Sequence, residues 1–187
     1  ITNTAGGSEN IAIGNYAMDA NTSGDRNVAL GFHALGANNA GISNTAIGYY
    51  TMVSNTSGID NTAVGRRALM SNTTADNNTS VGMNSLYTNT GSNNTALGYN
   101  SLTANTTGAD NTAVGSGTLI SNTTGTRNVA VGSAQSGVDV GTLALNTTGD
   151  NNTALGFKAL RSNTTADNNT AVGSNALNAN TTGFANT

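Results

Sequence analysis

The feature that most constrains this chain is a five-residue phrase that returns at a nearly constant interval. The phrase has the pattern Asn-[Thr/Ile/Val]-[Ala/Ser]-[Val/Ile/Leu]-Gly, and ten copies begin at Asn10, Asn27, Asn44, Asn61, Asn78, Asn94, Asn111, Asn128, Asn152 and Asn169. Neighbouring copies are 17 residues apart, except for one step of 16 after Asn78 and one step of 24 after Asn128. Such self-similarity is typical of proteins that stack equal units. We count positions within each unit from the opening Asn, which is position 1.

A unit of 17 residues is too short for a helical hairpin, and the phrase has the composition of a short strand. Ala-Leu at positions 8 and 9 predicts a second short extended piece, and Gly at position 5 with Gly or Ala at position 15 predicts corners. Equal coils in register predict an all-β fold, a parallel β-solenoid of about ten 17-residue coils. At the ~4.8 Å spacing of paired strands, the rod is on the order of 50 Å long.

We interpret residues 1–187 as a single repeat domain. Residues 1–9 form a partial coil, residues 10–185 form the ten coils, and residues 186–187 begin another coil. No polar cap is recognisable at either end of this series, so we expect the rods to stack end to end into filaments.

Each coil offers few large apolar residues for a core. We expect position 4 to point inward together with Leu at position 9, as in the pair Val64 and Leu69. Two aliphatic side chains bury little area against the entropy of ordering a coil, and the chain has no Cys that could form a disulfide. We therefore expect a second apolar face to pack against identical chains in a homotrimer.

The composition argues against several classes of function. Only 8% of the residues are charged and the six Lys and Arg residues are scattered, so we expect no nucleic-acid partner. No apolar run approaches the ~20 residues of a membrane span, so we expect no membrane insertion by this segment. His33 is the only histidine and the carboxylates are dispersed, so we expect no enzyme activity. The calcium-binding nonapeptide Gly-Gly-x-Gly-x-Asp is missing, and we expect no metal or other cofactor.

Stacking of equal coils places each position in a column along the rod. The Asn at position 1 is predicted to form a structural amide ladder, which includes Asn44, Asn61, Asn78, Asn94 and Asn111. Asn-Thr-[Ser/Thr] triplets at position 12 match N-glycosylation acceptors, but we interpret them as corner residues because Asn and Thr favour turns. Asx-type turns explain the aspartates two residues before an opening Asn, which are Asp25, Asp76, Asp150 and Asp167.

Positions 6 and 7 carry the most individual side chains. Successive coils align a candidate surface-binding stripe, which consists of Phe32, His33, Tyr49, Tyr50, Arg66 and Arg67. Further along the same columns lie Met83, Tyr99 and Phe157. A stripe of aromatic and Arg side chains on a neutral surface is suited to binding sugars or protein. The alternative is that these side chains cover a seam between subunits.

The 24-residue unit contains seven extra residues, from Gln135 to Gly141. We expect them to bulge from the rod as a loop, and recognition often lies on loops held by a rigid scaffold. The candidate insertion loop consists of Gln135, Ser136, Val138, Asp139 and Val140. The alternatives are a neutral insertion and a short extra strand in which Val138 and Val140 alternate with Asp139.

The phrase [TIV]-A-[VIL]-G followed by Ala-Leu resembles the head-type repeats of trimeric autotransporter adhesins. The longer form with Asn-Thr-Thr-Gly is similar to arrays in related bacterial surface proteins and bacteriophage tail-fibre proteins. The resemblance covers Asn10 to Thr187, although the usual head repeat is shorter. It implies a left-handed, trimeric β-roll that projects from a cell or virion and binds a host surface protein or glycan.

Two functions remain open from the sequence. The first is a non-catalytic, structural and adhesive segment of a trimeric extracellular fibre, as in a cell-surface adhesin or a phage tail fibre. The alternative is an ice-binding β-solenoid, because regularly spaced rows of Thr and Asn at a β-sheet interval can order water. The pairs Thr73-Thr74 and Thr106-Thr107 illustrate such rows.

Overall fold

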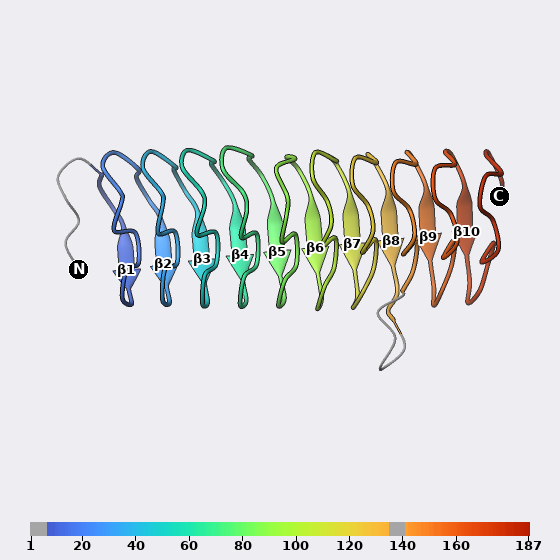
Figure 1. The fold of residues 1–187 in the computed structure, drawn as a ribbon, viewed down its shortest axis with the longest axis horizontal. Coiled ribbons are helices and arrows are strands. Elements are labelled where there is room, and N and C mark those ends of the chain that lie inside the picture. Colours follow the sequence, from blue (N-terminus) through green and yellow to red (C-terminus); the bar gives the residue numbers. More distant parts are fainter. Residues whose placement is uncertain (1–6, 135–140) are drawn as a thin grey trace.

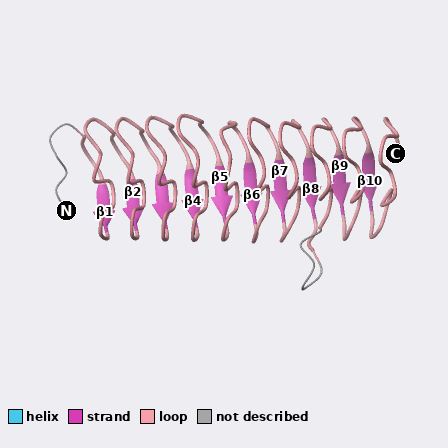
Figure 2. Cartoon of the chain, in the orientation of Figure 1, coloured by secondary structure: helices cyan, strands magenta, loops and turns pink. Residues whose placement is uncertain are grey.

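The structure is a computed structural model that describes residues 7–134 and 141–187, and these residues form one elongated β-solenoid (Figure 1). Ten parallel strands make a single sheet in chain order, which confirms the predicted fold class. Turns connect the strands, and the described residues contain no helix (Figure 2). The strands are β1 (Ile11–Ile13), β2 (Val28–Leu30), β3 (Thr45–Ile47), β4 (Thr62–Val64), β5 (Thr79–Val81), β6 (Thr95–Leu97), β7 (Thr112–Val114), β8 (Val129–Val131), β9 (Thr153–Leu155) and β10 (Thr170–Val172).

Each strand occupies positions 2 to 4 of its coil and pairs with the same positions of the next coil. The register holds across both irregular units, because Thr79 pairs with Thr95 after the short step and Val129 pairs with Thr153 after the long one. The change in coil length therefore leaves the pairing of the strands unchanged in both units.

The side chain at position 3, not position 4, points into the coil. Ala63 and Ala113 are fully buried, whereas Val64 is half-buried and Leu97 is 46% exposed. The prediction that position 4 points inward is therefore wrong. The physical reason is the alternation of side chains along a strand: the buried Asn at position 1 fixes position 3 on the inner face, so positions 2 and 4 must face outward.

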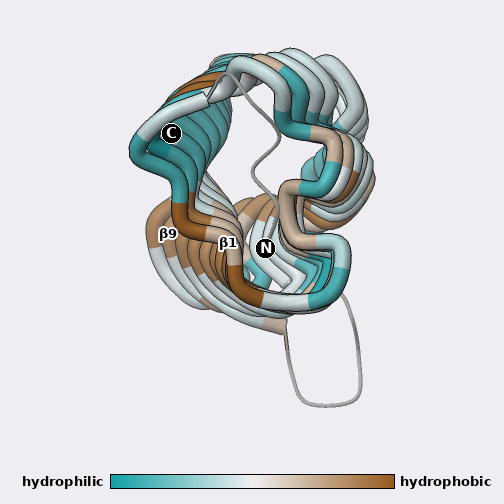
Figure 3. Tube along the Cα trace, turned by 90° about the vertical axis from the view of Figure 1, so that its left-hand side faces the viewer, coloured by the Kyte–Doolittle hydropathy of each residue, from teal (hydrophilic) through white to brown (hydrophobic). Residues whose placement is uncertain are grey.

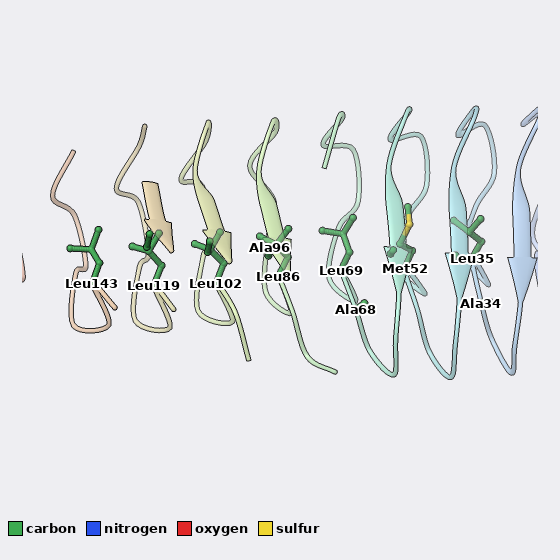
Figure 4. Packing of buried hydrophobic residues seen from close by; sticks show 14 of the residues in the cluster. Ala34, Leu35, Met52, Ala68, Leu69, Leu86, Ala96, Leu102, Leu119 and Leu143 are labelled. Carbon is green, nitrogen blue, oxygen red and sulfur yellow. The ribbon is translucent and has the colours of Figure 1, made fainter. Parts of the chain in front are cut away.

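The Ala-Leu segment is a series of turns, so the predicted second extended piece is also wrong. The residue at position 9 has a left-handed backbone in every coil, with φ of 50° at Leu69 and 51° at Leu102. This conformation turns the large side chain inward, and burying it stabilises the coil by about 1.5–3 kcal/mol, which offsets the ~1–3 kcal/mol cost of the strained backbone. The resulting column fills the core (Figure 4) and contains Met18, Leu35, Met52, Leu69, Leu86, Leu102, Leu119, Leu143 and Leu160.

Glycine at position 5 ends each strand because the coils approach too closely there for a side chain. At Gly65 the backbone φ is 133°, and a Cβ atom would lie 2.7 Å from the carbonyl oxygen of Gly82 in the next coil. The corner after each strand is therefore a direct contact between backbones.

We predict that Leu102→Ala lowers the free energy of unfolding by about 2–5 kcal/mol, because it leaves a cavity in the fully buried Leu column. Ile59→Ala is the matched control, since Ile59 is 37% exposed and lies outside this column, and its effect is expected to be within about 0.5 kcal/mol. Thermal and urea melts followed by circular dichroism measure both. Equal losses in the two variants would contradict the assignment of the core.

Candidate functional site

The Asn residues at position 1 form a continuous chain of buried amides inside the rod. The Nδ2 group of Asn44 donates to Oδ1 of Asn27 at 3.1 Å and to the carbonyl oxygen of Gly58 at 2.7 Å. The same Oδ1 of Asn27 accepts the backbone N–H of Asn44 at 2.9 Å. Each amide thus uses both donor hydrogens and its acceptor, so a polar column is satisfied within the core. Equivalent contacts extend this position-1 ladder through Asn61, Asn78, Asn111 and Asn128.

A second amide ladder runs along position 12, and sequence reasoning missed it. Nδ2 of Asn55 donates to Oδ1 of Asn38 at 2.8 Å and to the carbonyl oxygen of Gly58 at 3.2 Å. Most of these Asn residues, such as Asn55, begin a glycosylation-like triplet, and they are buried, with their amide nitrogens in hydrogen bonds. Their recurrence at the same 17-residue interval as the Asn of position 1 was the available signal. The position-12 ladder contains Asn21, Asn38, Asn55, Asn72, Asn89, Asn105, Asn122, Asn146 and Asn163.

Both ladders change at the coil that is one residue short. Oδ1 of Asn72 is buried without a hydrogen-bond partner, so the position-12 ladder is interrupted between Asn72 and Asn89. At the same level, Nδ2 of Asn94 donates directly to Oδ1 of Asn89 at 3.3 Å, whereas in a regular coil the two ladders share a carbonyl acceptor, such as that of Gly58. Its backbone N–H still donates to Oδ1 of Asn78 at 2.9 Å. The missing residue thus leaves the sheet intact and changes the polar core.

The aspartates before the opening Asn link neighbouring coils, which corrects the expectation of local Asx turns. Oδ1 of Asp76 accepts the backbone N–H of Ile59 at 2.8 Å, and Oδ1 of Asp25 accepts that of Ser8 at 2.6 Å. The pKa of the Asp25 carboxyl is lowered mainly by this backbone hydrogen bond and then by the Ser8 hydroxyl. Stacking supplies the partner from 17 residues away, which a local turn rule does not consider.

The outer face of the sheet is a candidate interaction surface that the single chain leaves uncovered. Its position-4 column consists only of Val, Ile and Leu, and its position-2 column consists of Thr, Val and Ile. Leu30, Leu97 and Val172 in this outer face are 42%, 46% and 67% exposed. Viewed along the rod, the hydrophobic residues form a continuous band beside the strands (Figure 3).

The Thr residues of the Asn-Thr-Thr corners are only partly free to contact water. The hydroxyl groups of Thr106 and Thr123, at position 13, donate to backbone carbonyls of the next coil at 2.9 and 3.0 Å. Position 14 is exposed at Thr74 and Thr107, but this row has no member in the short coil and has Ala40 at a more N-terminal coil. The position-14 row is therefore irregular in sequence and interrupted at the short coil.

The structure brings the aromatic members of the candidate surface-binding stripe into direct contact on two successive coils. Phe32 stacks with Tyr49, and His33 stacks with Tyr50, at ring-centroid distances of 5.5 and 5.0 Å. Tyr16, which the sequence analysis did not include, stacks on His33 at 4.7 Å. Arg66 and Arg67 occupy the same two positions in the next coil. The stripe is thus an aromatic cluster followed by two cations.

The candidate insertion loop, at Gln135, Ser136, Val138, Asp139 and Val140, lies outside the described residues. Over residues 7–134 and 141–187, no group of three or more His, Cys, Asp or Glu side chains is placed to hold a metal ion. In the same part of the chain, no helix has the length and apolar character to cross a membrane.

Comparisons with known proteins found no matching family model, no matching curated protein and no matching solved structure.

We predict that Asn55→Asp strongly lowers the melting temperature at neutral pH. The carboxylate would face two acceptors, Oδ1 of Asn38 and the carbonyl oxygen of Gly58, so an unpaired charge would be buried at a cost of about 3–5 kcal/mol. Asn77→Asp makes the same exchange at an exposed site and is expected to change stability by less than about 0.5 kcal/mol. Similar melting curves for both variants would mean that the position-12 ladder does not depend on its donors.

A second prediction concerns the stability of the fold at low pH. Because the folded-state pKa of Asp25 is lowered, its carboxylate stabilises the fold above about pH 4, and that contribution is lost as the pH falls through the lowered value. Asp25→Asn keeps an acceptor oxygen but does not titrate. The difference in melting temperature between wild type and Asp25→Asn should be constant above about pH 4 and should shrink at lower pH. Parallel curves down to the acid limit would contradict the prediction.

Proposed function

We propose that this chain is a rigid, non-catalytic segment of an extracellular fibre, in which identical chains pack side by side through the outer face of the sheet. The observation that carries this proposal is the uncovered position-4 column, which presents an aliphatic side chain in every coil. Contiguous apolar surface of this kind marks an interaction site in a protein that must remain in water. Lateral packing would remove it from solvent.

A second copy of the chain is the partner that fits this surface best. The outer face has no charged residue at positions 2 or 4, so two such faces meet without burying a charge. Both faces also repeat with the same coil spacing, so one chain matches another coil by coil. Three chains around a common axis would place the three outer faces against one another, in agreement with the resemblance to trimeric adhesin heads.

The connections between coils support a role as a rigid spacer. Outside the strands, the backbone N–H of Leu102 donates to the carbonyl oxygen of Thr118, and that of Asn100 donates to Met83, both at 3.0 Å. Together with the two amide ladders, these bonds hold every described coil to its neighbours at several points around its circumference. A rod of this kind suits a fibre on a cell surface or virion, with recognition left to its exposed side chains.

Ice binding is less well supported as an alternative. An ice-binding face needs a uniform array of exposed hydroxyl groups. Here the position-13 hydroxyls donate to the protein backbone, and the position-14 row is interrupted at the short coil. The outer face does carry Thr at most position-2 sites, but each lies beside an aliphatic residue that favours protein contact.

We predict that the chain sediments at about three times its 18.6 kDa mass at low micromolar concentration. Val114→Asp places a charge on the outer face and should shift the protein to smaller assemblies, whereas the matched variant Val114→Thr should retain them. Ala113→Asp places the charge inside the coil and should instead prevent folding. A wild-type chain that remains a stable, folded monomer would overturn the proposal.

A further inference from the structure

The aromatic cluster contains two sets of rings with different orientations. Tyr16, His33 and Tyr50, all at position 7, form a stacked column with interplanar angles of 13° and 26°. Both faces of the His33 ring are therefore covered by its neighbours. Phe32 and Tyr49, at position 6, are parallel to each other within 13° but steeply inclined to this column, since Phe32 meets His33 at 86° and Tyr49 meets Tyr50 at 65°.

These angles define a small aromatic platform. Because both faces of His33 are occupied, its contact with Phe32 at 4.5 Å directs the edge of His33 against one face of Phe32. Tyr49 lies in the same way beside Tyr50, at 4.6 Å. The position-7 column thus contacts Phe32 and Tyr49 from one side, and Phe32, which also stacks with Tyr49, is half-buried. Tyr49 is 46% exposed, in agreement with an open platform.

The position-7 residues adopt a backbone conformation that their side chains do not favour. Tyr16 and Tyr50 have φ of 58° and 56°, in the left-handed region. At the same position other coils have Asn84, Asn100 and Gly117, which tolerate this conformation better. None of these aromatic rings belongs to the buried core. Arg67 and Lys158 have the same backbone conformation, with φ of 57° at both, so it belongs to position 7 of the coil and not to the aromatic residues alone.

Two cations extend the platform into the next coil. Arg66 follows Tyr49 in the position-6 column and Arg67 follows Tyr50 in the position-7 column. In the described part of the chain, neither guanidinium has a hydrogen bond or ion pair with a carboxylate; Arg66 contacts the sulfur of Met83 at 3.6 Å. Positions 6 and 7 of the described coils contain no Asp or Glu. Arg66 is exposed, and its charge is available to an anionic partner, whereas Arg67 is half-buried and its Nε is buried without a hydrogen-bond partner.

We propose that this surface binds an acidic glycan that lies along the rod. The apolar faces of two sugar rings would pack on Phe32 and Tyr49, and a carboxylate or sulfate group of the glycan would contact Arg66 and Arg67. An aromatic platform supplies apolar contact with a sugar ring, and a guanidinium fork matches the geometry of a carboxylate. This inference rests on the proposed adhesive fibre and names the chemistry of its partner.

The test is titration of the wild-type chain with hyaluronan oligosaccharides and with neutral cello-oligosaccharides of equal length, followed by calorimetry. We expect binding of the acidic oligosaccharide, and about tenfold weaker binding by Tyr49→Ala. Tyr99→Ala is the matched control, because Tyr99 occupies the same position of another coil, is 42% exposed and has no ring partner in the described structure. It should bind like the wild type.

The double variant Arg66→Gln/Arg67→Gln should lose the preference for the acidic oligosaccharide and the salt dependence of binding, whereas Arg127→Gln, on another column, should keep both. Absence of binding by the wild type, or equal losses in Tyr49→Ala and Tyr99→Ala, would overturn the inference. So would dissociation of the assembly by Tyr49→Ala, which would make the stripe a subunit seam. Sedimentation of the same samples separates these outcomes from a failure of the fibre proposal.

Discussion

The hydrogen bond between buried Asn side chains of successive coils is the interaction on which the rest of this structure depends. It satisfies the amide groups in the core, and it aligns each coil with the next because one Oδ1 atom accepts both the backbone N–H and the Nδ2 group of the following Asn. A core built from one large side chain per coil and small Ala residues supplies limited hydrophobic stabilisation. The amide ladders add specificity of register, since only a shift by a whole coil restores every bond.

The position-1 ladder also determines which residues of each strand face the solvent. An inward Asn at position 1 forces the small Ala inward and the aliphatic residue at position 4 outward. The larger apolar side chains of the strand are therefore excluded from the interior of their own coil. This division explains how a chain with a polar core carries its most hydrophobic surface on the exterior, where another protein chain can cover it.

The sequence was sufficient to predict the coil length, the strands and their register, because these follow from the spacing of one phrase. It was not sufficient to predict which face of the strand is inside, since Val64 is the larger apolar residue and Ala63 is the one that the Asn alternation buries. The turn at Leu69 was missed because Leu rarely adopts positive φ, and tertiary packing overrides that preference here. The columns of the stripe followed from the period, but the angles between the rings and the contribution of Tyr16 required coordinates.

The short coil has a consequence for how the rod comes apart. In a stacked-repeat protein, cooperativity passes only between neighbours, so it is limited by the weakest junction. The buried and unpartnered Oδ1 of Asn72 marks such a junction, with the ladder resuming at Asn89. The position-12 ladder is thus divided into two segments, whereas the position-1 ladder crosses the same junction through Asn78, which donates to Oδ1 of Asn61. Partial unfolding under load or heat would then stop at this boundary, leaving the coils on one side as a folded template on which the others reassemble.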